Sequence, residues 1–321
     1  MRILANEFII PFREGRECHA SHLLPMEDGK IFCVFFYGSR EGRGDVRIYG
    51  CMRNADCKWS DPVPLSEDDG VPHWNPVLLQ RRDGAAVLFY KVGKSIADWI
   101  TKCRISYDGC VTWSEPFEMV DGDRSGGRGP VRNKAIYLSD GSVVAPASTE
   151  RGEWKCFFDR SVDNCNSWVR GNDIRCFDNV EEQLKRGIIQ PSLWESENGV
   201  HALMRSSEGR IYRTDSIDCG VNWCDPYPIS MPNNNSGIDL VRIPDGRVIL
   251  ACNPVSDNWG KRTPLSLYIS SDDGLNFEFY SHLVTMEGRY AYPAMVYENG
   301  RLHITFTWNR KTIQYLCLTD I

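Results

Sequence analysis

Six basic side chains lie in segments that flank strand-like runs, far apart along the chain: Arg128, Arg132, Lys134, Arg205, Arg262 and Arg310. Guanidinium groups bind carboxylates in a planar, two-point geometry, so their convergence would create a site for an acidic ligand. The chain as a whole is acidic, with a formal charge of −6. This balance argues against a nucleic-acid partner, whose binding depends on neutralising phosphates. The alternative is that each basic side chain is simply solvated.

Four other residues carry groups that transfer protons: His19, His73, Tyr290 and Tyr292. Histidine titrates near neutral pH and can act as an acid, a base or a hydrogen-bond partner. The structural alternative makes the two histidines hydrogen-bonded interior residues and makes Tyr292, which precedes Pro293, a packing residue.

Composition limits the possible classes of protein. Hydrophobic residues make up 42% and charged residues 25%, which is typical of globular proteins. No apolar run approaches the roughly 20 residues of a membrane span, and no signal peptide is visible, so we expect no membrane partner and a cytoplasmic location. The 13 cysteines include no C-x-x-C pair and no zinc-finger spacing, which favours reduced thiols. We find no metal motif and no phosphate-binding loop, and we expect no cofactor.

Turn motifs recur at a regular interval along the sequence. Asp-Gly or Asn-Gly turns end at Gly29, Gly84, Gly141, Gly199, Gly246 and Gly300, with spacings of 55, 57, 58, 47 and 54 residues. Each turn separates two strand-like runs, which is a strong hairpin signal.

A second motif follows these hairpins and matches the pattern S-x-D-x-G-x-x-W. Its aromatic ends fall at positions 59, 113, 168, 223 and 277, with spacings of 54, 55, 55 and 54 residues. The Ser and Asp side chains are suited to bind backbone N–H groups of a tight turn, and the aromatic residue to pack between sheets. Cys110 and Cys165 stand where the pattern has glycine.

These repeats predict an all-β chain, a six-bladed β-propeller in one domain of residues 1–321. The N-terminal strand, Ile3 to Phe12, has no hairpin partner and should close the ring as the outer strand of the last blade. Only residues 180–184 look like a helical turn.

A propeller site is expected in the bowl on the face where the innermost strands begin and the second strands end. The candidate ligand-binding residues in these segments are Arg40, His73, Asn75, Arg132, Lys134, Arg205, Asp239, Arg262 and Arg310. A carbohydrate that carries a carboxylate is the expected partner.

The five motifs, which are Asp-boxes, resemble those of the sialidase (neuraminidase) superfamily over essentially the whole chain. That resemblance implies three arginines on a sugar carboxylate, a tyrosine nucleophile paired with a glutamate, and an aspartate acid/base. Arg205 and Arg262 resemble the second and third arginines. Tyr292, or alternatively Tyr290, takes the place of the nucleophile. Asp45 resembles the acid/base, with Glu41 as the alternative.

Two positions depart from the family pattern. His19 stands where the first arginine belongs, and Gln190, which cannot accept a proton, stands where the glutamate belongs. The chain thus resembles a divergent branch in which His19 joins the site. The expected function is an exo-acting glycoside hydrolase on a terminal acidic sugar, sialic acid or a relative. The alternatives are a lyase that cleaves beside a uronic acid with histidine and tyrosine, and a non-catalytic glycan-binding propeller.

Overall fold

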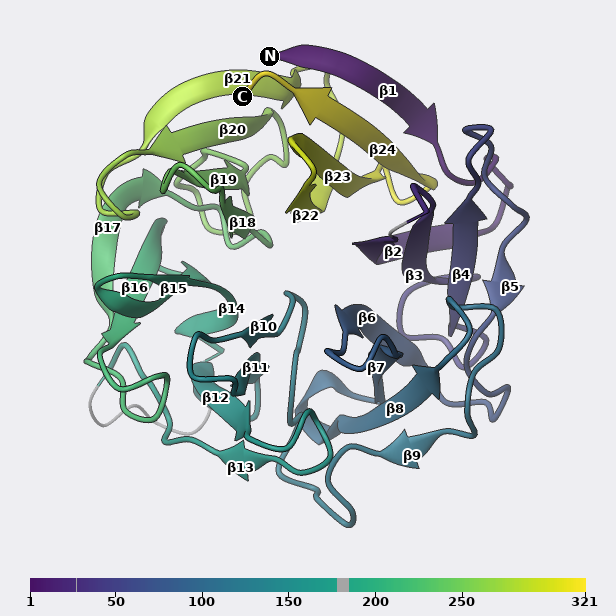
Figure 1. Ribbon diagram of the computed structural model, residues 1–321, viewed down its shortest axis with the longest axis horizontal. Coiled ribbons are helices and arrows are strands. Elements are labelled where there is room, and N and C mark those ends of the chain that lie inside the picture. Colours follow the sequence, from purple (N-terminus) through teal and green to yellow (C-terminus); the bar gives the residue numbers. More distant parts are fainter. Residues whose placement is uncertain (27, 178–184) are drawn as a thin grey trace.

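The computed structural model describes residues 1–26, 28–177 and 185–321. Its strands form six four-stranded antiparallel sheets arranged as blades around a common axis (Figure 1), which confirms the predicted six-bladed β-propeller. Among the described residues the single helical element is the 3₁₀-helix η1 (Ile96–Asp98). The helical turn expected at residues 180–184 lies outside the described residues.

The strands of each blade follow one another outward from the axis, and blades 1 to 6 are numbered by their innermost strands. These are β2 (Glu17–Pro25), β6 (His73–Gln80), β10 (Ile136–Tyr137), β14 (Ile188–Ser196), β18 (Asp239–Arg242) and β22 (Tyr290–Glu298). The second strands are β3 (Ile31–Gly38), β7 (Ala86–Val92), β11 (Val143–Thr149), β15 (Gly199–Ser206), β19 (Val248–Cys252) and β23 (Arg301–Trp308).

The two outer positions complete each sheet. The third strands are β4 (Arg47–Arg53), β8 (Ile100–Ser106), β12 (Lys155–Ser161), β16 (Arg210–Ser216), β20 (Leu265–Ser270) and β24 (Thr312–Thr319). The fourth strands are β5 (Val63–Pro64), β9 (Phe117–Glu118), β13 (Val169–Arg170), β17 (Tyr227–Pro232), β21 (Glu278–Val284) and, in blade 6, β1 (Arg2–Phe8).

The predicted glycine turns join the first strand of each blade to its second strand. Gly84 and Gly141 have φ angles of 87° and 90°, a left-handed conformation that glycine adopts without steric cost. Because these hairpins are antiparallel, the entrances of the innermost strands and the ends of the second strands lie on one face of the ring. We call this the upper face.

The Asp-boxes join the third and fourth strands and have the predicted local structure. In blade 3, Asp163 Oδ1 accepts hydrogen bonds from the backbone N–H groups of Asn166 (3.2 Å) and Ser167 (2.9 Å). Cys165, in the glycine position, has a φ of 71°. Trp223, the aromatic end of the blade 4 box, stacks on Phe158 of blade 3, with ring centroids 3.9 Å apart. The boxes therefore fasten neighbouring blades together.

Strand β1 closes the ring, as predicted. It pairs antiparallel with β24 from Arg2↔Thr319 to Phe8↔Gln314, and Figure 1 shows it outermost beside β24. Glu7 of β1 also contacts blade 1, since its Oε1 lies 2.6 Å from Arg53 Nη2 and its Oε2 accepts a 2.8 Å hydrogen bond from Trp59 Nε1.

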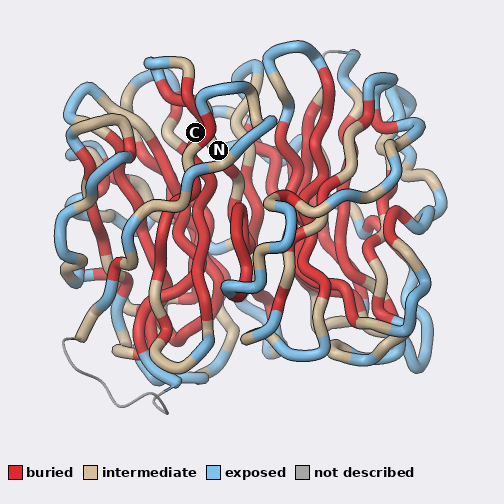
Figure 2. Tube along the Cα trace, turned by 90° about the horizontal axis from the view of Figure 1, so that it is seen from below, coloured by how far each residue is buried: buried red, intermediate tan, exposed pale blue. Residues whose placement is uncertain are grey.

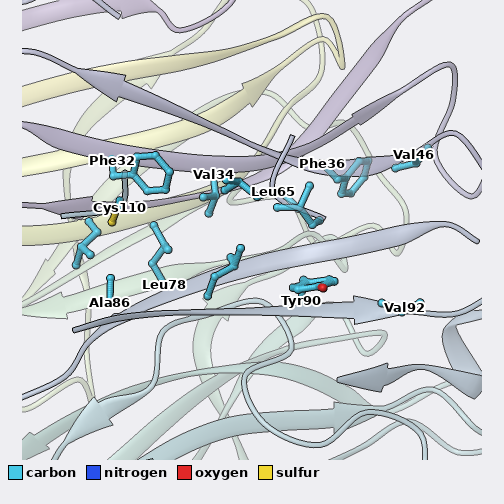
Figure 3. Packing of buried hydrophobic residues seen from close by; sticks show 14 residues of the cluster. Phe32, Val34, Phe36, Val46, Leu65, Leu78, Ala86, Tyr90, Val92 and Cys110 are labelled. Atoms are coloured by element: carbon cyan, nitrogen blue, oxygen red, sulfur yellow. The ribbon is translucent and has the colours of Figure 1, made fainter. Parts of the chain in front are cut away.

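Apolar residues fill the spaces between adjacent blades. Figure 2 shows buried strands running between two exposed faces. In Figure 3, side chains of β3 lie on one side of the core between blades 1 and 2, and Leu78, Ala86 and Tyr90 lie on the other. Burial of a Leu or Phe side chain stabilises a fold by about 1.5–3 kcal/mol, so these layers hold the loops of the upper face in fixed positions.

All 13 cysteines are free thiols, as the sequence predicts. The described part of the chain has no helix long and apolar enough to cross a membrane.

Candidate active site

Four innermost strands carry an irregularity near their entrance on the upper face. The register of β2, β6, β14 and β22 shifts there, and a residue other than glycine has a positive φ: Ala20 (53°), Asn75 (44°), Gln190 (55°) and Tyr292 (59°). A bulge takes a residue out of the strand ladder and redirects its side chain. A left-handed backbone is strained for a bulky residue such as tyrosine, and such strain is typical of functional sites.

The bulges of blades 4 and 6 bring two predicted site residues into contact. The Tyr292 hydroxyl accepts hydrogen bonds from Arg205 Nη1 at 3.0 Å and from Gln190 Nε2 at 3.4 Å. The same Arg205 nitrogen donates to Gln190 Oε1 at 3.1 Å. Within the described residues, no carboxylate forms a hydrogen bond with this phenol.

Positive charge surrounds the Tyr292 ring. The guanidinium carbon of Arg132 lies 5.0 Å from the ring centroid, and those of Arg205 and Arg262 each lie 5.9 Å from it. Burial by itself raises the pKa of Tyr292, but Arg205, Arg262 and the hydrogen bond from Gln190 together lower it by more, so the pKa of the phenol falls below its ordinary value. The arginines therefore favour the ionised form of the phenol.

His19 packs beside this tyrosine, with ring centroids 4.1 Å apart. Its Nδ1 forms a 2.7 Å hydrogen bond with Thr307 Oγ1, and its buried Nε2 has no partner among the described residues. Burial, reinforced by the field of Arg310, Arg262 and other arginines, holds the pKa of His19 well below its usual value. The imidazole is therefore neutral at neutral pH, so it offers a hydrogen bond or a lone pair, but no positive charge for a carboxylate.

The arginines around the ring differ in how firmly they are held. Arg205 is anchored by Asn235, whose Oδ1 accepts hydrogen bonds from Nε (3.0 Å) and Nη2 (2.9 Å). Arg132 Nη2 donates to Pro293 O at 2.6 Å, while its buried Nε and Nη1 have no partner in the described structure. Burial lowers the pKa of Arg262 to about 10, which leaves this group charged at neutral pH. Together they place three guanidinium groups around the Tyr292 ring. We refer to His19, Arg132, Gln190, Arg205, Arg262 and Tyr292 as the bowl.

Other predicted residues are engaged elsewhere. Lys134 and Asp239 form a buried ion pair with a 2.8 Å Nζ–Oδ1 distance, and Asp239 also accepts from Ser192 Oγ at 2.6 Å. His73 Nδ1 forms a 2.6 Å hydrogen bond with Ser66 Oγ. Among the described residues, none of these three predicted side chains forms a hydrogen bond with the Tyr292 phenol.

The remaining predicted residues occupy varied positions. Tyr290 is buried, and its hydroxyl donates to Glu287 O at 3.2 Å. Asn75 is buried at its bulge, and Arg40 is exposed. Arg310 Nη1 lies 2.5 Å from Glu41 Oε2, so these two candidates form an ion pair.

Asp45 lies in the loop after β3 and is held as a carboxylate. It accepts hydrogen bonds from the Ser39 backbone N–H (2.9 Å) and from Ser39 Oγ (2.7 Å), and Arg16 Nη1 lies 3.0 Å from Oδ2. Burial raises the pKa of Asp45, but these contacts together outweigh it and hold the pKa below its ordinary value. A proton donor in glycoside hydrolysis requires the opposite shift.

Two further residues lie on the upper face: Glu150, whose role the sequence does not indicate, and Trp259, a rim tryptophan that could stack on a sugar ring. Burial raises the pKa of Glu150, which follows β11, even though Arg205 and Lys185 partly offset the effect. Trp259, in the loop after β19, is 61% exposed and has its ring centroid 5.8 Å from the Arg205 guanidinium carbon. Both follow the second strand of a blade, and this position is the one feature of the sequence that marks them.

Comparison with known proteins identifies the family. Residues 29–304 match the BNR repeat-like domain, so the chain belongs to this family. Its fold is that of the sialidase-like BNR propellers. No curated protein sequence matches the chain.

Several solved structures share this fold. A protein of unknown function from Dyadobacter fermentans is 14% identical, with a TM-score of 0.78 over 99% of each chain. The intramolecular trans-sialidase from Ruminococcus gnavus is 12% identical, with a TM-score of 0.74 over 94% of each chain. The NanB sialidase from Streptococcus pneumoniae is 12% identical, with a TM-score of 0.74 over 97% of this chain and 71% of that one.

Proposed function

We propose that this protein is a sialidase-like glycoside hydrolase that removes a terminal acidic sugar, sialic acid or a relative, from a glycan. The observation that carries the proposal is the Tyr292 phenol, hydrogen-bonded to Arg205 at 3.0 Å and surrounded by the bowl arginines. The structural neighbour from Ruminococcus gnavus, solved in complex with oseltamivir carboxylate, supports an acidic ligand.

In this proposal the arginines bind the sugar carboxylate and Tyr292 attacks the anomeric carbon. A phenol suits this task because a carboxylate nucleophile would be repelled by the acidic substrate. Gln190 cannot take the phenol proton, so the activation of Tyr292 comes from the lowered pKa that Arg205 and Arg262 impose. Water then hydrolyses the sugar–tyrosine bond and restores the phenol.

The leaving oxygen needs a proton, for which the chain offers two candidates. The family resemblance favours Asp45, whereas the raised pKa of Glu150 provides the protonated carboxyl that the step requires. Substrates with a good leaving group need no proton donor. Replacement of the residue that acts as the acid, by Asp45→Asn or Glu150→Gln, should therefore slow the cleavage of natural glycans on the order of 10²-fold. The cleavage of activated aryl glycosides should slow far less.

A uronate lyase is the second candidate, favoured by the neutral His19, which packs beside Tyr292 and whose Nε2 has no partner in the described part of the chain. An arginine would neutralise the uronate carboxylate, and His19 or Tyr292 would remove the neighbouring proton and allow the sugar–oxygen bond to break.

Mass spectrometry of products from sialosides and uronate-containing oligosaccharides distinguishes the two reactions. Hydrolysis gives products whose masses sum to substrate plus one water, and a lyase gives products that sum to the substrate with an unsaturated uronate. Tyr292→Phe should lower turnover by on the order of 10³-fold or more and retain sugar binding. Tyr290→Phe, a neighbouring buried tyrosine, is the control and should retain activity. Binding without turnover on the whole panel would contradict the hydrolase and leave the glycan-binding propeller.

A further inference from the structure

A groove extends from the bowl along the boundary between blades 5 and 6. It has a volume of about 870 Å³ and runs between the loop after β19 and the segment before β22. Trp259, Lys261 and Arg262 line one wall, and Glu287 and Arg289 line the other. Arg262 also faces the Tyr292 ring, so the groove and the bowl share this side chain.

The walls of the groove are fixed by hydrogen bonds. Asn234 Nδ2 donates to Lys261 O at 2.6 Å, and the Trp259 N–H donates to Asn234 O at 3.1 Å. On the opposite wall, the Arg289 N–H donates to Asn309 Oδ1 at 2.7 Å. The Tyr290 N–H donates to Arg262 O at 2.9 Å and joins the two walls. A site held in this way needs little ordering when a ligand binds.

A further pair of hydrogen bonds, made by Asn235, connects the groove to Arg205. Asn235 anchors Arg205 and also donates from Nδ2 to Asn258 Oδ1 at 3.0 Å, in the loop that carries Trp259 and Lys261. A ligand in the bowl would therefore have the groove directly beside it.

The charge of the groove is positive. Lys261, Arg262 and Arg289 face one carboxylate, that of Glu287. Lys261 and Arg289 are exposed, and their side chains form no ion pair or hydrogen bond within the described residues. Arg310 of the upper face, in contrast, forms an ion pair with Glu41. Two cations that have no partner in the described structure, both in one fixed groove, fit an anionic ligand.

We infer that this groove binds a second acidic group of the same glycan, either the carboxylate of a neighbouring acidic sugar or a sulfate ester. The protein then prefers substrates in which the terminal acidic sugar is followed by another negative charge. This inference rests on the proposed function and specifies its substrate class.

The test compares three glycans: monosialyl lactose, disialyl lactose, and sialyl lactose sulfated on the adjacent galactose. At low ionic strength, kcat/KM should be about five-fold higher for at least one doubly charged glycan, and salt should reduce the preference. The double variant Lys261→Ala/Arg289→Ala should lose the preference and retain its activity on monosialyl lactose. Lys94→Ala, which removes an exposed lysine of blade 2, is the control and should retain the preference.

The outcomes separate the groove from the proposed reaction. A preference for only one of the two charged glycans supports the groove and identifies its ligand as carboxylate or sulfate. Equal kcat/KM for all three glycans, or a preference that persists in the double variant, overturns the inference while the hydrolase proposal stands. If no glycan is cleaved, the hydrolase proposal fails, and calorimetric affinities for the same glycans test the groove independently. Equal affinities for the three glycans then overturn the inference about the groove.

Discussion

At the scale of single residues, the lowered pKa of Tyr292 is the property on which the proposed chemistry depends. Arg205 and Arg262 supply a positive field that, with the hydrogen bond from Gln190, outweighs burial. Removing one of these charges must therefore raise the pKa of the phenol, and the fraction of Tyr292 that is ionised at a given pH must fall.

Arg262→Gln is the variant that tests this argument. Activity that requires the ionised phenol rises with pH through the pKa of Tyr292, so the ascending limb of the kcat/KM profile should move to higher pH in Arg262→Gln. Ultraviolet titration of the tyrosinate should show the same shift. Arg262→Lys keeps the charge and should keep most of the native profile. If the ascending limb of the profile is unchanged in Arg262→Gln, the charge of Arg262 does not activate Tyr292.

Residue identity and spacing predict part of this site and leave the rest undetermined. Arg205, Arg262, Gln190 and Tyr292 were identified by their positions within the repeat, and they meet in the structure. The sequence does not show that Lys134 and Asp239 neutralise each other, because their contact joins blades 3 and 5 and depends on side-chain reach. Nor does it show the raised pKa of Glu150, which results from burial.

At the scale of the element, the Asp-box explains why the fold was predictable from the sequence. Its turn is built by contacts between residues at most four positions apart, such as Asp163 with Ser167, so the motif carries its own structure. The bulges at Gln190 and Tyr292 have no such local signature beyond the proline that follows each of them.

Asp163→Ala should destabilise the protein by about 1–2 kcal/mol, since two backbone N–H groups lose their acceptor. Hydrogen bonds from Ser167 and its neighbours lower the pKa of Asp163 to about 2. This depressed pKa adds stability above the unfolded value of about 4, and the contribution disappears as pH falls toward 2. Denaturant unfolding should thus show the two proteins converging in acid. Asp163→Asn keeps an acceptor and should lose less stability, and a constant difference at every pH would contradict the argument.

At the scale of the whole molecule, the ring is closed by a strand from the opposite end of the chain. β1 covers β24, which would otherwise expose an unpaired edge, and Glu7 ties β1 to Arg53 of blade 1. The bowl draws its residues from blades 1, 3, 4, 5 and 6, namely His19, Arg132, Gln190 with Arg205, Arg262, and Tyr292. Its geometry therefore depends on closure.

Deletion of residues 1–8 should thus lower the stability more than any single substitution in β1 and should promote self-association through the β24 edge.

Glu7→Gln keeps the strand but weakens the contact with the Arg53 guanidinium, and should lower the free energy of unfolding by about 1–2 kcal/mol. Arg2→Ala breaks the 3.7 Å ion pair with Asp320, whose two side chains are 70% and 65% exposed, and should leave the stability unchanged.

Thermal unfolding measures the stability of these variants, and light scattering measures their self-association. Addition of a synthetic peptide of residues 1–8 should return the deletion variant to the monomeric state, because the peptide pairs with β24. A deletion variant as stable and monomeric as the full chain would show instead that the remaining contacts between blades hold the ring without its closing strand.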